Sequence, residues 1–317
     1  MPEAWSPEAW SALTIALGVA VATLRAATPL VLAGMGELVT ERSGVLNLGV
    51  EGTMLVGAAC GFIGTIVAGP AVGLLCAAAA GAAMSLLFAA LTLGLMANQV
   101  ASGLALTIFG IGLSALIGFN YQGQPLPGLA TMLFPDLAAR PPLVQQVLLL
   151  DPTVWLAVGL PFAVAWFLRR TRAGLILRAV GESHDVAFAL GYSVRRIRLL
   201  AVLFGGVMSG LAGASLSLAY TPMWTENMVA GRGWIALALV VFSTWKPVTL
   251  LLGALLFGFM TIAQFQAGAL GIDVSPHLLA TLPYLATIVV LVLISRNATR
   301  LRLSVPAALG KPFHISS

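Results

Sequence analysis

The stretch that decides the fold of this chain is Gly36–Gly52, which reads GELVTERSGVLNLGVEG. It places three glutamates, an arginine and an asparagine between two long apolar runs. A charged side chain at the centre of a membrane helix costs about 2.5–3.5 kcal/mol on insertion scales. Because only 9% of the chain is charged, this concentration of polar groups and glycines indicates irregular backbone that lines a cavity inside a membrane domain.

The overall composition agrees with a membrane domain. The chain has 317 residues, of which 59% are hydrophobic, and its mean hydropathy is +1.00. These values exclude an ordinary soluble globular protein, in which about a quarter of the residues are charged. The apolar runs are about 20 residues long and do not alternate as barrel strands do. The sequence therefore predicts an all-α, polytopic transmembrane helical bundle.

The number of spans follows from these runs. The region 29–52 is expected to hold a broken or half helix, and the apolar segment 233–245 is short for a full crossing. We therefore expect about nine or ten spans. The apolar segments are 11–35, 46–69, 71–97, 100–120, 152–168, 199–220, 233–245, 247–267 and 279–295.

The distribution of basic residues predicts the orientation. Lysine and arginine gather on the cytoplasmic side of membrane proteins, so the loop 169–198 and the C-terminal tail are both expected inside. The proline-rich segment 121–151 then lies outside and is expected to be irregular. Nine spans put the N-terminus outside and ten put it inside. The cytoplasmic basic residues are Arg169, Arg170, Arg172, Arg178, Arg195, Arg196, Arg198, Arg296, Arg300, Arg302 and Lys311.

Two interpretations of the motif remain open. If a helix begins near Val45, Asn47 and Glu51 lie one turn apart on one face, and with Gly49 and Gly52 they form a hydrogen-bonding surface on a solute pathway. Alternatively, Asn47 caps a helix and Glu51 interacts favourably with the helix dipole.

Two further sets of charged residues nearby each have two possible interpretations. Glu41 and Arg42 either pair with partners elsewhere in the chain or form an interfacial ion pair that anchors a hairpin. The segment 225–234, with Glu226 and the glycine-flanked Arg232, forms either a re-entrant turn near the pathway or an ordinary external loop.

The second candidate site is the segment Leu177–Tyr192, which reads LRAVGESHDVAFALGY. Its opening residues predict a turn, and an amphipathic helix is expected over 182–191 with Gly191 as its stop. Such a helix on the cytoplasmic face suits docking into a groove of a soluble subunit; the alternative is a solvated basic loop that only fixes topology. The docking candidates are Gly181, Glu182, Asp185, Ala187, Leu190 and Gly191.

No catalytic or metal-binding pattern is predicted. Lys246 and Lys311 are each followed by proline, so the chain lacks the lysine-Ser/Thr pair of a Walker A loop. No Ser/His/Asp or Cys/His arrangement argues for catalysis, the histidines are scattered, and Cys60 and Cys76 lie in apolar runs. The net charge of +5 fits the positive-inside bias rather than a nucleic-acid partner.

The motif Gly36–Gly52 resembles the hallmark of integral-membrane permeases of bacterial ABC importers for simple sugars and nucleosides, and is closest to the nucleoside branch. Arg178–Glu182, Ala187, Leu190 and Gly191 resemble the family's cytoplasmic coupling segment, and Asn227–Gly233 resembles a second-half motif. The resemblance covers about residues 11–300. Ser243 stands where the family often has glycine, and the tail beyond about Arg302 resembles nothing in the family.

The resemblance implies a type II-like ABC importer permease in the bacterial inner membrane. Its permease domain would cover residues 1–302, with a coupling loop at about 169–198 and a cytoplasmic tail at 303–317. It implies a second, different permease subunit, an extracytoplasmic solute-binding protein, and separate ATPase subunits that hold ATP and magnesium. This chain would bind no cofactor and catalyse no reaction.

Other functions remain open from the sequence. The transported solute is expected to be a nucleoside, with a simple-sugar or branched-chain amino-acid ABC permease as the alternative. A function of a different class is a proton-coupled secondary transporter, in which Glu51 would be the titrating group.

Overall fold

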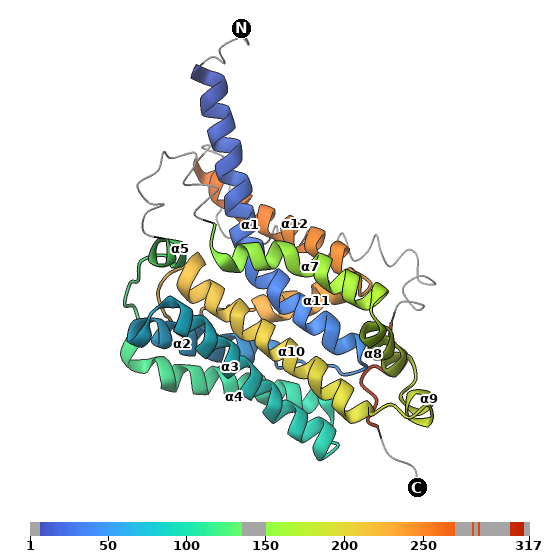
Figure 1. Cartoon of the computed structure of the whole chain (residues 1–317). Coiled ribbons are helices and arrows are strands. Elements are labelled where there is room, and N and C mark those ends of the chain that lie inside the picture. Colours follow the sequence, from blue (N-terminus) through green and yellow to red (C-terminus); the bar gives the residue numbers. More distant parts are fainter. Residues whose placement is uncertain (1–6, 135–149, 270–280, 282–284, 286–304, 314–317) are drawn as a thin grey trace.

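The computed structural model describes residues 7–134, 150–269, 281, 285 and 305–313. Within them the chain is helical, and the only β-structure is two isolated bridges that join Gln122 to Trp224 and Pro125 to Met223. Figure 1 shows the helices gathered into one bundle. In chain order the elements are α1 (Pro7–Arg42), α2 (Val50–Ala68), α3 (Pro70–Ala89), the π-helical turn η1 (Ala90–Gly94), α4 (Gln99–Gly118), the 3-10 turn η2 (Phe119–Tyr121), α5 (Leu129–Leu133), α7 (Pro152–Arg170), α8 (Arg172–Glu182), α9 (His184–Ala189), α10 (Val194–Ala214), the π-helical turn η4 (Ser215–Tyr220), α11 (Arg232–Phe242) and α12 (Pro247–Ala269).

Seven of the described helices are long and apolar enough to cross a membrane. They are α1, α2, α3 with η1, α4 with η2, α7, α10 with η4, and α12. The predicted segment 233–245 forms α11, which has only 11 residues, and the predicted segment 279–295 lies outside the described residues. The all-α, polytopic fold is confirmed, and α11 is too short to count as a full span.

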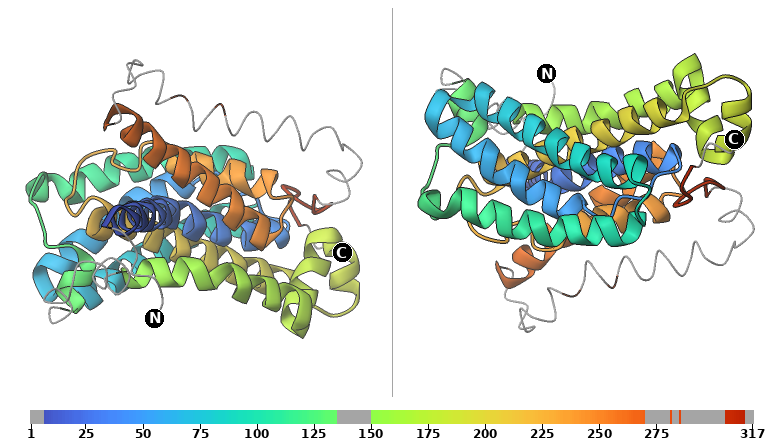
Figure 2. Two further views of the ribbon diagram at one scale, coloured as in Figure 1. Left: turned by 90° about the horizontal axis from the view of Figure 1, so that it is seen from above. Right: turned by 90° about the horizontal axis from the view of Figure 1, so that it is seen from below.

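Helix α1 lies in the middle of the bundle. It packs against α10, α12, α11 and α7, and the end-on views of Figure 2 show α12 and α7 on opposite sides of it. Helices α2, α3 and α10 form a second tightly packed group. A Cβ atom on Gly57 of α2 would lie 2.5 Å from the Gly210 Cα of α10. Small residues therefore allow these backbones to touch, as is common for helices in lipid.

The predicted break in the motif lies at residues 43–49. Helix α1 continues through Arg42 and ends in a Schellman turn, in which Gly44 has a φ of 89°. The Val45 N–H donates to Thr40 O and the Gly44 N–H donates to Glu41 O. The next helix begins at Val50 and not near Val45, so the prediction that Asn47 and Glu51 share a helix face is wrong.

The segment 45–49 enters the bundle alongside α4. The Leu46 N–H donates to Gln99 Oε1 at the start of α4, and Thr107 donates to Leu48 O further along. A Cβ atom on Gly110 would lie 2.5 Å from Gly52 Cα. The rise from Gln99 to Gly110 is about 16 Å, roughly half of a ~30 Å hydrocarbon core. Helix α2 therefore begins near the middle of the membrane.

Helix α11 has a matching half-depth placement. Its first turn lies beside Glu51 at the start of α2, because a Cβ atom on Gly233 would lie 2.6 Å from Glu51 Cα. Its 11 residues rise about 16 Å and end near Trp245, which bonds Glu41 and Arg42 at the end of α1. The structure thus favours the re-entrant interpretation of Arg232 over an ordinary external loop.

The second candidate site consists of two short helices. The opening residues of Leu177–Tyr192, where a turn was expected, belong to helix α8, which extends over Arg172–Glu182. The helix predicted over 182–191 is shorter, because Ser183 interrupts it and caps α9 by accepting a hydrogen bond from the Val186 N–H. The predicted stop at Gly191 is confirmed, since α9 ends at Ala189 and Gly191 has a φ of 86°.

Candidate functional site

Glu51 caps the N-terminus of the half-depth helix α11. Its Oε1 accepts a hydrogen bond from the Gly231 N–H at 2.7 Å, and its Oε2 accepts one from the Gly233 N–H at 2.6 Å. The side chain is only 4% exposed. The first N–H groups of a helix lack partners within the helix and carry its positive dipole end. The Glu51 carboxylate accepts hydrogen bonds from N–H groups at this helix start and places a negative charge at its positive dipole end, although Glu51 and Gly231 are 180 positions apart.

The other predicted pathway residues lie against α4. Asn47 is buried, and its Oδ1 accepts a hydrogen bond from the Gly49 N–H at 2.9 Å, which holds the turn into α2. A Cβ atom on Gly49 would lie 2.7 Å from the Leu106 side chain, and one on Gly52 would lie 2.7 Å from Leu106 O. Whether these residues line a solute pathway stays a prediction; their contacts give them roles in helix packing.

The remaining charges of the motif stabilise neighbouring turns. Glu37 Oε1 accepts a hydrogen bond from the Asn47 N–H at 2.9 Å. Glu41 Oε2 accepts one from Trp245 Nε1 at 2.5 Å, and the Arg42 guanidinium donates to Trp245 O at 3.1 Å. Glu41 and Arg42 therefore hold the turn between α11 and α12 from opposite sides of one tryptophan.

Arg232 is half-buried at the start of α11. Its guanidinium donates to Met228 O and Val229 O and lies 5.6 Å from the centre of the Tyr220 ring, a cation–π distance. Trp234 is 38% exposed beside it. The Arg232 guanidinium and the Tyr220 ring thus lie together beside the start of α11, and interrupted helices of this kind form binding sites in transporters.

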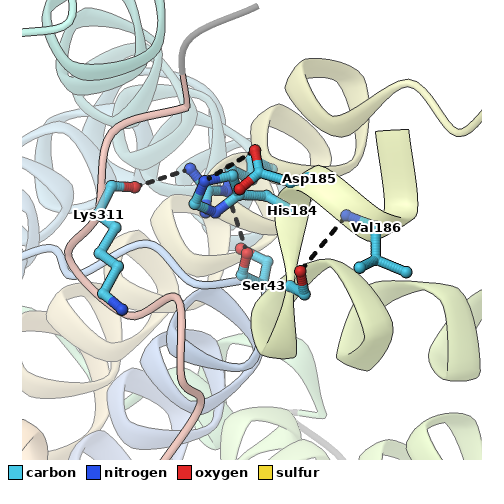
Figure 3. Close-up of polar contacts among 7 residues, drawn as sticks. Ser43, His184, Asp185, Val186 and Lys311 are labelled. Carbon is cyan, nitrogen blue, oxygen red and sulfur yellow. Dashed lines mark hydrogen bonds and ion pairs between the residues drawn. The ribbon is translucent and has the colours of Figure 1, made fainter. Parts of the chain in front are cut away.

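At the end of the bundle that carries α8 and α9, Arg198 joins three segments. This α10 side chain is 1% exposed; its Nε donates to Ser43 O at 3.2 Å and its Nη1 donates to Lys311 O at 3.1 Å. Its Nη2 lies 3.4 Å from His184 Nδ1. Figure 3 shows these contacts converging from the motif turn, the C-terminal segment and α9.

The surroundings of the histidine in this cluster favour its neutral form. Burial and the neighbouring Arg198 lower the pKa of His184, although Asp185 opposes this effect. An arginine donates to Nδ1 only when that nitrogen carries a lone pair, which leaves the proton on Nε2. His184 Nε2 lies 3.6 Å from Asp185 Oδ1, whose side chain is largely exposed.

The predicted coupling residues pack α8 and α9 onto the end of α1. A Cβ atom on Gly181 would lie 2.1 Å from Arg42 O, so only glycine permits this approach. Ala187 is buried with Val180, Val194 and Phe313. The C-terminal segment closes the assembly, since the Ala308 N–H donates to Gly181 O and the Gly310 N–H donates to Gly44 O.

One face of α9 remains uncovered in the chain by itself. Leu190 is 71% exposed and Val186 is 59% exposed, and the two residues are one turn apart. Phe188 is partly exposed and packs against Phe313, with ring centres 5.4 Å apart. Glu182 and Asp185 are exposed at the edge of this surface.

The comparison with known families identifies the chain. Residues 19–295 match the family described as "Branched-chain amino acid transport system / permease component". The chain belongs to this family of ABC transporter permeases.

Relatives of the permease carry names for different solutes. A putative glucose ABC transporter permease protein, TsgC13 of Haloferax volcanii, is 40% identical over 95% of this chain and 99% of its own length. The guanosine ABC transporter permease protein NupQ of Bacillus subtilis is 33% identical over 85% and 89%. The nucleoside ABC transporter permease protein NupC of Lactococcus lactis is 31% identical over 84% and 88%. No solved structure matches the permease.

The sequence analysis did not assign Arg198 and Phe313 to the site. Arg198 was counted only as a topology signal, and Phe313 lies in a tail that resembled nothing in the family. The available signal for Arg198 was its position in the amphipathic helix α10, four residues after Val194 and four before Val202, on the stripe that the helix buries. Among the described residues, no three His, Cys, Asp or Glu side chains gather as a metal site requires.

Proposed function

We propose that this permease forms half of the translocation pathway of an ATP-driven, binding-protein-dependent importer of nucleosides. The observation that carries the proposal is the continuity at one end of the bundle. The uncovered α9 surface lies next to Arg198, and Arg198 is bonded to the turn that ends α1 and opens the motif. A force applied to α9 would thereby reach the segment that leads to the middle of the membrane.

Docking of an ATPase subunit on α9 is the first part of the proposal. Val186 and Leu190 present an apolar surface of the kind that an amphipathic helix inserts into a groove. The arginines around it favour a cytoplasmic location for this end by the positive-inside rule, with the C-terminal segment on the same side. The permease then resides in the cytoplasmic membrane with the start of α1 outside.

The Leu190→Asp variant tests this docking. We expect it to fold but to lose transport and stimulation of ATP hydrolysis, because replacing an interface anchor costs about 2 kcal/mol or more. ATPase association and uptake would be measured at matched membrane abundance. Ser193→Asp is the control, since it adds the same charge at an exposed position beyond Gly191. Full uptake with a wild-type ATPase complex in Leu190→Asp would refute the docking.

The energy source is tested with purified components. The permease alone is expected to show no ATP hydrolysis, and uptake into proteoliposomes should need internal ATP, an ATPase subunit, a binding protein and a second, different permease subunit. The second candidate mechanism is proton coupling through Glu51. The hydrogen bonds that both Glu51 oxygens accept do not favour it. Uptake driven by a pH gradient with this chain alone would establish it.

The nucleoside assignment is the finer part of the proposal. It is supported by the similarity of the motif to the nucleoside branch and by two relatives with nucleoside or guanosine in their names. The name of TsgC13 favours glucose as the second candidate. The Tyr220 ring beside the Arg232 guanidinium offers a stacking surface of the kind that a nucleobase uses. Uptake of labelled guanosine competed by adenosine and by glucose separates the two; competition by glucose alone would refute the nucleoside assignment.

A further inference from the structure

A cavity of about 570 Å³ lies between α7 and α10 and borders the second candidate site at Leu177 and Tyr192. Val39 of α1 lines its inner side, and Ala173, Ile176 and Leu177 of α8 close one end. This volume falls within the ~300–1,000 Å³ range of small-molecule pockets. Among the residues that line it, Tyr192 carries the only polar side chain. Its occupant must therefore present hydrocarbon over most of its length.

The cavity opens toward the membrane. Leu200 of α10 lines it and is 67% exposed, and Ala163 of α7 also lines it and is exposed. Both residues belong to helices that qualify as membrane spans. A hydrocarbon chain can therefore enter sideways from the bilayer without crossing water.

Charge at one end of the cavity restricts the occupant further. Along α7, Phe167 lines the cavity and Arg170 lies three residues later on the same face. Along α10, Leu200 lines the cavity and Arg196 lies four residues earlier. Arg172 has the same spacing to Ile176 in α8. All three arginines are exposed, and each lies within about one helical turn of a residue that lines the cavity.

We propose that this cavity binds one acyl chain of an anionic phospholipid, whose phosphate is held by Arg170, Arg172 and Arg196. The chemistry matches at both ends, since an apolar body meets an apolar cavity and an anionic head meets three guanidinium groups. Basic pockets between membrane helices on the cytoplasmic side bind anionic headgroups in this way. A zwitterionic lipid lacks the net charge that these arginines recognise.

The bound lipid would join the membrane to the coupling end of the permease. The cavity that would hold the lipid lies among α7, α8 and α10. Helix α8 leads into α9 through Ser183, and α10 carries Arg198. An occupied cavity would brace α8 between the two spans. Anionic lipid is therefore expected to raise thermal stability as well as to bind.

Native mass spectrometry of the full-length, detergent-purified permease tests the proposal. Palmitoyl-oleoyl phosphatidylglycerol is titrated in parallel with the matching phosphatidylcholine. We expect one tight phosphatidylglycerol adduct in the wild type and weaker phosphatidylcholine binding. The double variant Arg170→Gln/Arg196→Gln should bind phosphatidylglycerol roughly tenfold or more weakly, as expected for the loss of two contacts to an anionic lipid.

Arg169→Gln/Arg195→Gln is the matched control. It removes the same charge from the neighbouring positions, which lie on other faces of α7 and α10, and it should retain wild-type binding. An equal loss of phosphatidylglycerol binding in both double variants, or equal binding of the two lipids, would show only nonspecific attraction. Either result would overturn the proposal.

The apolar part is tested by filling the cavity. Ala163→Trp should remove the adduct while size-exclusion elution and the thermal unfolding midpoint confirm a folded protein; an unchanged adduct in this variant would overturn the proposal. Disulfide-linked dimers of Ala163→Cys in native membranes would also overturn it, because they would place a second copy of the chain over the opening. The lipid-binding test does not depend on the transported solute, so its result is distinguishable from a failure of the proposed function.

Discussion

The motif Gly36–Gly52 takes part in burying two charges of opposite sign, one at the turn that follows α1 and one at the start of α2. At one end, the cation of Arg198 meets backbone carbonyls at the C-terminal end of α1 and in the C-terminal segment. At the other end, the anion of Glu51 meets backbone N–H groups at the N-terminus of α11. Each charge therefore lies at the helix end whose dipole favours it.

The difference between these regions lies in what else each charge contacts. Glu51 joins two elements near the middle of the membrane, and both its oxygens have partners. Arg198 joins three segments, one of which is α9 with its uncovered apolar surface. We infer that the Glu51 region is a fixed support, whereas the Arg198 region passes movement from α9 to α1.

The Arg198→Met variant tests this contrast with the largest expected effect. It removes the donor from Ser43 O and Lys311 O, and each buried carbonyl left unpaired costs about 1–3 kcal/mol. We expect a clear fall in the thermal unfolding midpoint in detergent and uncoupling of ATP hydrolysis from uptake.

Arg195→Met is the matched control for Arg198→Met. Arg195 is an exposed arginine in the same helix turn, and its replacement should change stability by less than about 0.5 kcal/mol. If both variants behaved alike, the joining role of Arg198 would have to be abandoned.

The Glu51→Gln variant addresses the opposite end of the motif. Glutamine keeps one acceptor oxygen and presents an NH₂ group where the second oxygen was, so one of the two α11 N–H groups loses its partner. The expected loss is about 1–3 kcal/mol, measured as a lower unfolding midpoint, with reduced uptake that follows the loss of folded protein.

Glu226→Gln controls for the loss of a carboxylate, because Glu226 is exposed in the loop before α11. A Glu51→Gln variant with wild-type stability but altered apparent affinity for the solute would instead assign Glu51 to the pathway. That outcome would make the Glu51 region the functional one and reverse the comparison.

The sequence predicted most of the architecture because apolar length is a local property. The membrane class, eight of the nine apolar segments as helices, and the stop at Gly191 all follow from composition and local backbone preferences. The start of α2 was misplaced because Asn47 and Gly49 form a local turn that competes with helix formation. The pattern of residues 45–52 fits either structure.

The partners of the buried charges could not be predicted from the sequence. Glu51 and Gly231 are 180 positions apart, and Glu41 and Trp245 are 204 positions apart. Only the packing of α1, α2 and α11 brings these groups together. Nothing local in the tail indicated that Phe313 would contact α9, because that contact exists only after Arg198 has fixed the segment.

The corrected geometry changes the expectation for Asn47→Ala. Asn47 bonds Gly49 and Glu51 bonds α11, so their side chains share no bonding partner. We expect Asn47→Ala to cost about 0.5–1.5 kcal/mol and to add to Glu51→Gln within about 0.5 kcal/mol. The double variant and both single variants, measured by unfolding, check this. A larger coupling would show that the two side chains act together.

The smallest expected effect concerns His184 and sharpens the comparison through pH. Burial and Arg198 lower the pKa of His184, so the unfolded chain takes up a proton at a higher pH than the folded protein. Its contribution to stability is then fully present above the unfolded pKa of about 6.5 and is lost as the pH falls through the lowered folded pKa. Asp185 and Lys311 also face the ring, with opposite effects.

The His184→Asn variant isolates this contribution. The asparagine oxygen replaces Nδ1 as an acceptor for Arg198, so the variant should match the wild type at pH 8. Between pH 7 and pH 5 its unfolding midpoint should fall less than that of the wild type, because the variant has no imidazole to protonate. Parallel pH curves for the two proteins would mean that His184 does not titrate against Arg198. The Arg198 region would then not respond to protonation. In that respect it would resemble the Glu51 region, which we infer does not respond to movement of α9.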